Sequence, residues 1–544
     1  MNATPASKAA PGAKPRDLRL DFFRGMAMFI ILLAHTPGNT WTLWIPARFG
    51  FSDATEIFVF CSGMASAMAF GAVFAKKSWF LGAARIAFRV WQVYWAHIGV
   101  FLATALLMLA LDQTGMGEEG KTYANWPSIV RFFTRTEETM LGLFTLTYVP
   151  GLFDILPMYL VILALVPFVM LAHRFGGRWA VFGMIFALWF AAQLSLWSRG
   201  DAAEMHALGR ALQGIGGWFS FLNLPSSPWR ESATWFFNPF GWQLVFFTGF
   251  AFGMKWLPAP PVNRRLVLLA AGYLLISLPF AWFKIHRGLY LPDPWLVHDW
   301  VFYARDWMSP LIWKTGVGGF RYLHFLALAY LAWAAVGPKG VRLNEGWTPP
   351  RPMRPFGLAV AGLIAVITIP YAYVDEIAAF APALDRLIVD VYGPLGLLLP
   401  EARIGMAQIV HLVCLLILVW AAIGAAWRGW IVKDGFLAVV PIIRKVGTQS
   451  LAVFMVSIVL SRFNGWWMDS LEAYFAERAA VDGWVYLNGR DVYVRALVNI
   501  TGFGVLIATA YLVGWFKSQP WRRDPKPQVT ASGTSPVAKP TPAE

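Results

Sequence analysis

Long apolar stretches alternate with shorter polar segments along most of the 544-residue chain. A helix that crosses a membrane needs about 20 consecutive, mostly apolar residues, and many of these stretches approach or exceed that length. The pattern therefore predicts an all-α, polytopic integral membrane protein with about twelve transmembrane helices. The predicted helices cover residues 20–36, 55–75, 87–111, 151–172, 179–197, 240–257, 263–283, 319–336, 356–374, 404–427, 448–465 and 493–516.

The composition agrees with this class of protein. Hydrophobic residues make up 58% of the chain and charged residues only 14%, whereas soluble domains carry about a quarter charged residues. An ordinary cytosolic enzyme, a nucleic-acid binder and a disordered scaffold are therefore poor fits. Cys61 and Cys414 both lie in apolar runs, so we expect small buried hydrophobes rather than disulfides. No cluster of potential ligands has the spacing of a metal site.

The net charge of +15 is distributed unevenly along the chain. Segments rich in Lys and Arg alternate with neutral or acidic segments, as the positive-inside rule requires of cytoplasmic and external loops. This alternation predicts an even number of spans and places both termini in the cytoplasm. We expect a membrane domain over residues 18–518 with long external loops, flanked by disordered cytoplasmic tails over 1–17 and 519–544.

The first predicted span carries the most specific polar pattern. Its sequence LDFFRGMAMFIILLAHTPGN places Asp21, Arg24 and His35 within or beside the membrane. Arg24 and His35 are 11 residues apart, which on a helix gives about 16 Å along the axis and an offset of only about 20°. Asp21 lies one turn before Arg24 and can pair with it. Ionisable groups in a span are functional candidates, and an imidazole suits general-base chemistry near neutral pH.

A structural interpretation of these residues also exists. Arg24 alone is explained well by snorkelling to the cytoplasmic headgroups, with His35 at the external interface. The pair is harder to explain in this way, because a helix that only anchors itself does not need a histidine in register with the arginine.

Arginine followed by ten residues and then histidine resembles the acyltransferase-3 superfamily of membrane O-acyltransferases. More closely, the segments DLRLDFFRGMAMFIILLAHTPGN, FGFSDATEIFVFCSGMASAMAFG and FNPFGWQLVFFTGFAFG resemble the OpgC family, whose members succinylate osmoregulated periplasmic glucans. The resemblance implies an acyltransferase-3-like helical bundle in a bacterial inner membrane. It also implies that His35 is catalytic, that Arg24 is the motif arginine, and that a cytoplasmic acyl-CoA acylates an external sugar.

Asp53 and Glu56, one turn apart at the start of the second predicted span, match the acidic segment of the superfamily. The functional interpretation, which we prefer, makes one of them an orienter of His35 or a sugar ligand. The structural alternative is capping of the helix by Ser52 and Asp53. For the neighbouring Ser62 and Gly63 we favour close helix packing.

Arg24 and two further groups are candidates for substrate binding. Arg85 and Arg89 would hold the phosphates of acyl-CoA, although any cytoplasmic loop is basic. Arg89 matches an arginine of the superfamily, but Gln92 replaces the proline that usually follows. At the outer mouth, amides and an aromatic ring would suit a sugar, with an interfacial aromatic belt as the alternative; these residues are Asn238, Trp242 and Gln243. His324 and His411 we assign to structural roles.

We therefore expect an O-acyltransferase that moves an acyl group, succinyl by resemblance, from acyl-CoA to periplasmic glucan. His35 would act either as general base or as an acyl relay. Acyl-CoA would be a substrate and no bound cofactor is expected; the other partners are glucan and the lipid bilayer, without nucleic acid. Whether the chain forms a homo-oligomer is left open. The main alternative is a secondary transporter of small anionic or sugar-like solutes, which the lack of inverted repeats disfavours. A non-catalytic envelope partner would leave His35 unexplained.

Overall fold

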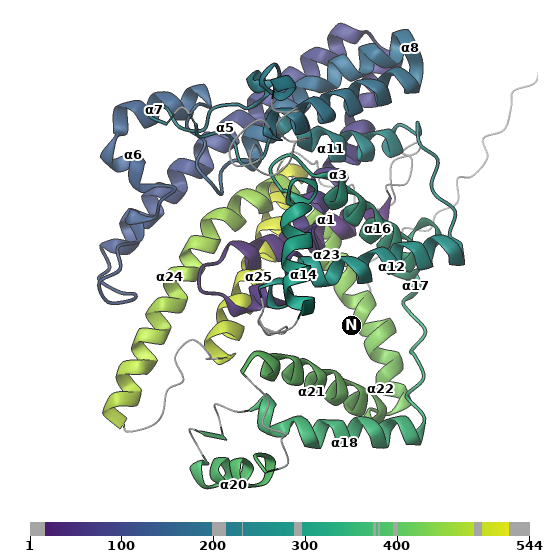
Figure 1. The fold of residues 1–544 in the computed structure, drawn as a ribbon. Helices are drawn as coiled ribbons and strands as arrows, with labels where there is room; N and C mark the ends of the chain where they lie inside the picture. The colour runs from purple at the N-terminus through teal and green to yellow at the C-terminus, as the bar shows by residue number, and fades with distance from the viewer. Residues whose placement is uncertain are drawn as a thin grey trace, which may run out of the picture.

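In the computed structural model the chain is built almost wholly from helices (Figure 1). The structure describes residues 17–197, 214–230, 232–287, 296–373, 377–378, 381–394, 401–482, 492–519 and 521. The predicted tails over 1–17 and 519–544 therefore lie outside the described residues, apart from 17, 519 and 521.

The helices are long where the sequence is apolar and short in the loops. The N-terminal part comprises α1 (Leu18–His35), η1 (Thr40–Trp44), α2 (Pro46–Phe49), α3 (Ala54–Ser66), η2 (Ala67–Gly71), α4 (Ala72–Lys76), α5 (Trp79–Asp112), η3 (Tyr123–Asn125), α6 (Val130–Thr134), α7 (Thr136–Thr145), α8 (Ile155–Trp197), η4 (Ser220–Leu222) and α11 (Pro239–Gly253). The remainder comprises α12 (Arg264–Ala281), α13 (Phe283–His286), α14 (Leu296–Trp307), α15 (Ser309–Ile312), α16 (Gly319–Val336), η5 (Pro338–Gly340), α17 (Arg342–Glu345), α18 (Pro355–Ala372), α20 (Pro382–Tyr392), α21 (Glu401–Ala422), α22 (Ala425–Trp430), η6 (Ile431–Gly435), α23 (Phe436–Thr448), α24 (Ser450–Asp482) and α25 (Val492–Ser518).

Every apolar stretch predicted from the sequence holds a helix, which confirms the all-α membrane class. The predicted count of about twelve spans is not confirmed. By length and hydropathy, eight described helices can cross a membrane, or nine if the bent pair Ala407–Ala422 and Ala425–Thr448 is one span.

Charged residues in α1, the short length of α11 and a backbone break in α8 explain the difference between the predicted and the observed number of spans. Helix α1 carries Arg19, Asp21 and Arg24, which lower its apolar character, and α11 has only 15 residues. Helix α8 consists of two helical stretches that meet at a break at Gly176 and Gly177, where Gly177 takes a positive φ of 61°. Its two halves were predicted as two spans.

Helix α1 lies in the middle of the bundle, where it packs against α3, α23, α24 and α25 (Figure 1). Helices α1 and α24 run side by side in the same direction. Near one end of α1 the Arg24 side chain donates to the Ser450 hydroxyl, and at the other end Arg462 donates to the backbone carbonyl of His35. These two contacts fix the register of α1 against α24.

The other helices surround this centre in pairs. Helix α11 packs against α3 and α8, α5 packs against α8 and α24, and α12 packs against α16. Helices α18 and α21 form a pair of their own, on the side of the molecule away from α8 (Figure 1). Cys414 is buried in that pair and Cys61 is buried in α3, as their apolar surroundings predicted.

Helices α3 and α11 approach each other closely because glycines face the neighbouring backbone. A Cβ atom on Gly63 would collide with the carbonyl oxygen of Phe246, and one on Gly249 would collide with that of Phe60. The close packing predicted for Ser62 and Gly63 is therefore confirmed, and both residues are buried.

The substitution Gly63→Ala tests this contact. Alanine normally stabilises a helix interior by roughly 0.5–1 kcal/mol relative to glycine, but here it should destabilise by roughly 1–3 kcal/mol because α3 and α11 must separate. The control is Gly99→Ala in α5, where nothing lies within 4 Å of the added Cβ atom. Thermal unfolding in detergent should show a lower midpoint for Gly63→Ala only; equal midpoints for the two variants would contradict the close approach.

Candidate functional site

A cavity of about 250 Å³, with both apolar and polar side chains in its lining, lies at the C-terminal end of α1. Its walls come from α1, η1, α2, the start of α3, the start of α8, α24 and the segments that precede α8, α11 and α16. Its polar lining consists of His35, Thr42, Arg48, Asp53, Thr55, Asp154 and Lys314. The cavity thus brings together side chains from the first helix and from loops far away in the sequence.

The His35 ring is held by its own helix. Its Nδ1 atom lies 2.8 Å from the backbone carbonyl oxygen of Ile31, one turn earlier. A carbonyl oxygen can only accept a hydrogen bond, so Nδ1 carries the proton and Nε2 of the neutral ring keeps its lone pair. Arg462 binds the His35 carbonyl and stacks over the ring of Trp126 at 4.4 Å. His35 is therefore arranged as a proton acceptor at the cavity wall.

Asp53 and Glu56 form a capping box at the start of α3. Asp53 Oδ1 accepts a hydrogen bond from the Thr55 amide at 2.7 Å, and Glu56 Oε2 accepts one from the Asp53 amide at 2.8 Å. This satisfies amide groups that a helix start leaves without partners. The capping expected as the structural alternative is confirmed for Asp53, whereas the Ser52 hydroxyl contacts His324 instead.

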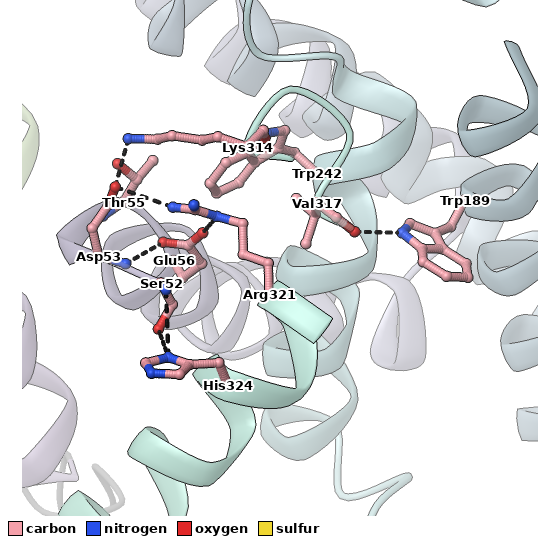
Figure 2. Close-up of polar contacts among 10 residues, drawn as sticks. All are labelled: Ser52, Asp53, Thr55, Glu56, Trp189, Trp242, Lys314, Val317, Arg321 and His324. Atoms are coloured by element: carbon pink, nitrogen blue, oxygen red, sulfur yellow. Dashed lines mark hydrogen bonds and ion pairs between the residues drawn. The ribbon is translucent and has the colours of Figure 1, made fainter. Parts of the chain in front are cut away.

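Both carboxylates also bind cations (Figure 2). Lys314 Nζ lies 2.6 Å from Asp53 Oδ2, and Nη2 of Arg321 lies 3.1 Å from the same oxygen. Arg321 Nε binds Glu56, whose side chain is fully buried. Burial by itself raises the pKa of Asp53, but the charges of Lys314 and Arg321 outweigh it and hold that pKa well below its usual value. Asp53 therefore remains ionised.

The structure pairs neither carboxylate with His35. The group on His35 Nδ1 is the Ile31 carbonyl, whereas Asp53 and Glu56 bind Lys314 and Arg321. Asp53 lines the cavity and Glu56 does not. Of the two roles anticipated for these carboxylates, contact with a bound sugar remains a hypothesis for Asp53.

The loop that carries Lys314 is fixed by four consecutive backbone carbonyls. Those of Lys314, Thr315, Gly316 and Val317 accept hydrogen bonds from α8 and from the start of α11. Trp242 Nε1 donates to the Lys314 carbonyl at 3.0 Å, and the Asn238 amide donates to that of Thr315 at 2.9 Å. Gln193 Nε2 donates to the Gly316 carbonyl at 2.6 Å, and Trp189 Nε1 donates to that of Val317 at 2.9 Å (Figure 2). The loop therefore holds Lys314 in a defined position.

The three residues proposed for the outer mouth do not line the cavity. Asn238 caps α11 through the amides of Phe240 and Gly241, and its Nδ2 donates to the carbonyl oxygen of Leu222. Trp242 is fully buried and so does not belong to an interfacial aromatic belt. Gln243 Nε2 donates to the carbonyl oxygen of Ile185 at 2.7 Å. Asn238 and Trp242 act on the site through the loop they hold.

The remaining predicted residues lie away from the cavity. Arg24 binds Ser450 near the opposite end of α1. Arg85 is exposed and lies over the ring of Phe70 at 5.8 Å. Arg89 Nη1 donates to Gln92 at 3.1 Å.

The two other histidines have structural partners. His324 Nδ1 lies 2.7 Å from the Ser52 hydroxyl oxygen (Figure 2), and His411 Nδ1 lies 2.9 Å from that of Thr368. Their predicted structural roles are confirmed.

Several residues of the site were not found from the sequence. Arg321 lies in the predicted span 319–336, so the same reasoning that selected Arg24 applies to it. Arg48 lies in the short helix α2, and Asp154 and Lys314 lie in loops, so no helical spacing relates these three residues to His35.

The helices and the cavity define a polytopic membrane protein with a histidine-containing polar site at the end of its first helix. The chain belongs to the OpgC family, because the family model described as "OpgC protein" matches residues 16–351 and 340–518. Membership suggests OpgC-like glucan modification and an acyltransferase activity. Comparisons with curated proteins and with solved structures gave no match.

The ion pair between Arg321 and Glu56 should be essential for stability. Arg321→Met leaves a fully buried carboxylate without its cation, and breaking such a pair costs about 3–5 kcal/mol. The double substitution Glu56→Gln with Arg321→Met removes both charges and keeps a side chain that completes the capping box. Thermal unfolding should therefore show a smaller loss for the double variant than for Arg321→Met alone. An equal loss would mean that the buried charge is not the cause.

Proposed function

We propose that the protein is a membrane O-acyltransferase of the acyltransferase-3 superfamily, which transfers an acyl group from cytoplasmic acyl-CoA to a hydroxyl group of a periplasmic glucan. The observation that carries the proposal is His35, whose Nε2 is left as a proton acceptor in a polar cavity at the end of a membrane helix. Membership of the OpgC family supports the same activity.

The chemistry needs one base. His35 Nε2 takes the proton of the acceptor hydroxyl while its oxygen attacks the thioester carbonyl carbon. The carbonyl oxygen becomes negative, and the tetrahedral intermediate then collapses with cleavage of the C–S bond. The imidazolium returns the proton to the departing thiolate, so the products are an ester and free CoA. In the relay variant, His35 first takes the acyl group itself.

In this proposal the two substrates lie on opposite sides of the membrane, and α1 runs from one side to the other. We place both termini in the cytoplasm and the cavity at the external end of α1. The opposite end carries Arg24, and nearby lie Lys517, which donates to Gln449, and Arg89, whose charge acts on Lys517. These cations suit the phosphates of acyl-CoA at the inner face.

A succinyl group suits the charges in the cavity. Lys314 is neutralised by Asp53, but no carboxylate of the described residues forms an ion pair with Arg48. Arg48 Nε instead donates to the Thr42 carbonyl oxygen at 3.2 Å, which leaves other guanidinium N–H groups for a ligand. A carboxylate at the end of the acyl chain would supply the missing negative charge.

His35→Ala should abolish acyl transfer. Purified protein in detergent is given labelled succinyl-CoA or acetyl-CoA with glucan, and the rate should fall by about 10²–10⁴-fold because the base is lost. The control is His173→Ala, since His173 stacks on Trp256 outside the cavity. Both variants should unfold at the wild-type temperature. Full transfer by His35→Ala would refute the mechanism, and solute flux without any transfer would favour a transporter.

Replacing both Arg85 and Arg89 with Gln tests the donor side. If these residues hold acyl-CoA, the KM for acyl-CoA should rise at least several-fold while the KM for glucan changes little. The matched control replaces Arg174 and Arg178 of α8 with Gln, because both are exposed and lie in a basic segment between two predicted spans, as a cytoplasmic loop would. Equal effects of the two double substitutions would assign Arg85 and Arg89 to general positive-inside charge.

A further inference from the structure

A second titratable side chain faces the cavity that contains His35. Asp154 lies in the loop that precedes α8, is only 3% exposed and lines the cavity. No side chain among the described residues forms a hydrogen bond or ion pair with its carboxyl group. The mechanism above does not use this residue.

The charges around Asp154 leave it without a cation of its own. Lys314 is the cation whose charge acts on it, but Lys314 Nζ already binds Asp53 at 2.6 Å. The other titratable or charged groups that line the same cavity are His35 of α1, Arg48 of α2 and Asp53 at the start of α3. His97 of α5 lies beside the backbone of Phe153, the residue before Asp154. A buried carboxyl group without a cation is more stable in its neutral form. Burial raises the pKa of Asp154 to about 7, although the hydrogen bond from its own backbone amide and the charge of Lys314 both lower it.

The two loops that bring Asp154 and Lys314 to the cavity share an unusual backbone feature. Leu152 has a φ of 83° and Val317 a φ of 56°, although neither is glycine. Such conformations cost about 1–3 kcal/mol each and persist only where the surrounding structure imposes them. Leu152 itself lines the cavity. The position of Asp154 is therefore set by the fold around it rather than by local preference.

We propose that Asp154 is a further catalytic residue, which in its neutral form donates a hydrogen bond to the acyl carbonyl oxygen as that oxygen becomes negative. This inference rests on the proposed acyltransferase function. The proton stays on Asp154, while His35 carries the hydroxyl proton to the thiolate, so the overall reaction is unchanged. Lys314 adds positive charge to the same cavity. Loss of one such donor slows acyl transfer by about 10²–10³-fold.

The pH profile of three proteins tests the proposal. In the wild type, kcat/KM should fall as the pH rises through about 7, because Asp154 then loses its proton and presents a negative charge to the oxyanion. Asp154→Asn keeps an N–H donor and has no proton to lose, so it should retain activity and lack this decline. Asp154→Ala should be about 10²–10³-fold slower. The control Glu137→Gln, on the exposed surface of α7, should keep the wild-type profile.

Other results would overturn the proposal. Asp154→Asn as slow as Asp154→Ala would show that the carboxylate is needed, and full activity of Asp154→Ala would show that no donor is needed. A decline near pH 7 that persists in Asp154→Asn would belong to another group. A wild type that transfers no acyl group would overturn the proposed function as well, so the two failures are distinguishable.

A measurement on the wild type alone covers the case in which the variants do not fold. Infrared spectra of protein labelled with ¹³C-aspartate should show the carbonyl band of a protonated aspartic acid below pH 7, with loss of the band as the pH rises through that value. Absence of the band at pH 6 would overturn the proposal, because Asp154 would then be ionised.

Discussion

The site depends on cations that balance the negative charges of two carboxylates at the start of α3, Asp53 and Glu56. Glu56 is fully buried and Asp53 lies at the cavity wall, so each must be matched by a cation or the helix start cannot stay inside the bundle. Arg321 of α16 contacts both carboxylates, and Lys314 contacts Asp53. The loop with Lys314 is in turn fixed by α8 and α11. One electrostatic requirement thus joins four helices around the end of α1.

Helix α1 contributes rigidity of a different kind. Its last turn fixes the His35 ring through a main-chain carbonyl, so the ring orientation is a property of the helix itself. Arg24 and Arg462 hold the register of α1 against α24 near both ends. Ion pairing at Lys314 and helical hydrogen bonding at His35 therefore position two side chains of the same cavity by independent means.

The sequence predicts much of the fold and part of the site. Hydropathy locates the helices because burial in lipid needs long apolar runs. It does not settle the number of spans, because α1 is charged, α11 is short and α8 breaks at Gly176 and Gly177. His35 and Arg24 were found because a helix relates residues at fixed spacing. Lys314 and Asp154 were not, because loop positions depend on contacts such as those of Trp242 and Gln193, which no periodicity encodes.

The two partners of the buried ion pair lie far apart in the sequence, and this separation affects the order in which the structure can assemble during synthesis. Glu56 and Arg321 are 265 residues apart, so at a synthesis rate of about 5–20 residues per second α3 is complete roughly ten to fifty seconds before its cation exists. During that interval the start of α3 carries two uncompensated carboxylates, which favours a place at the membrane surface, where water solvates them. The ion pairs of Asp53 and Glu56 can form only after Lys314 and Arg321 have been synthesised. The ion pairs at the cavity are therefore completed late in synthesis, although His35 and the start of α3 lie far earlier in the chain.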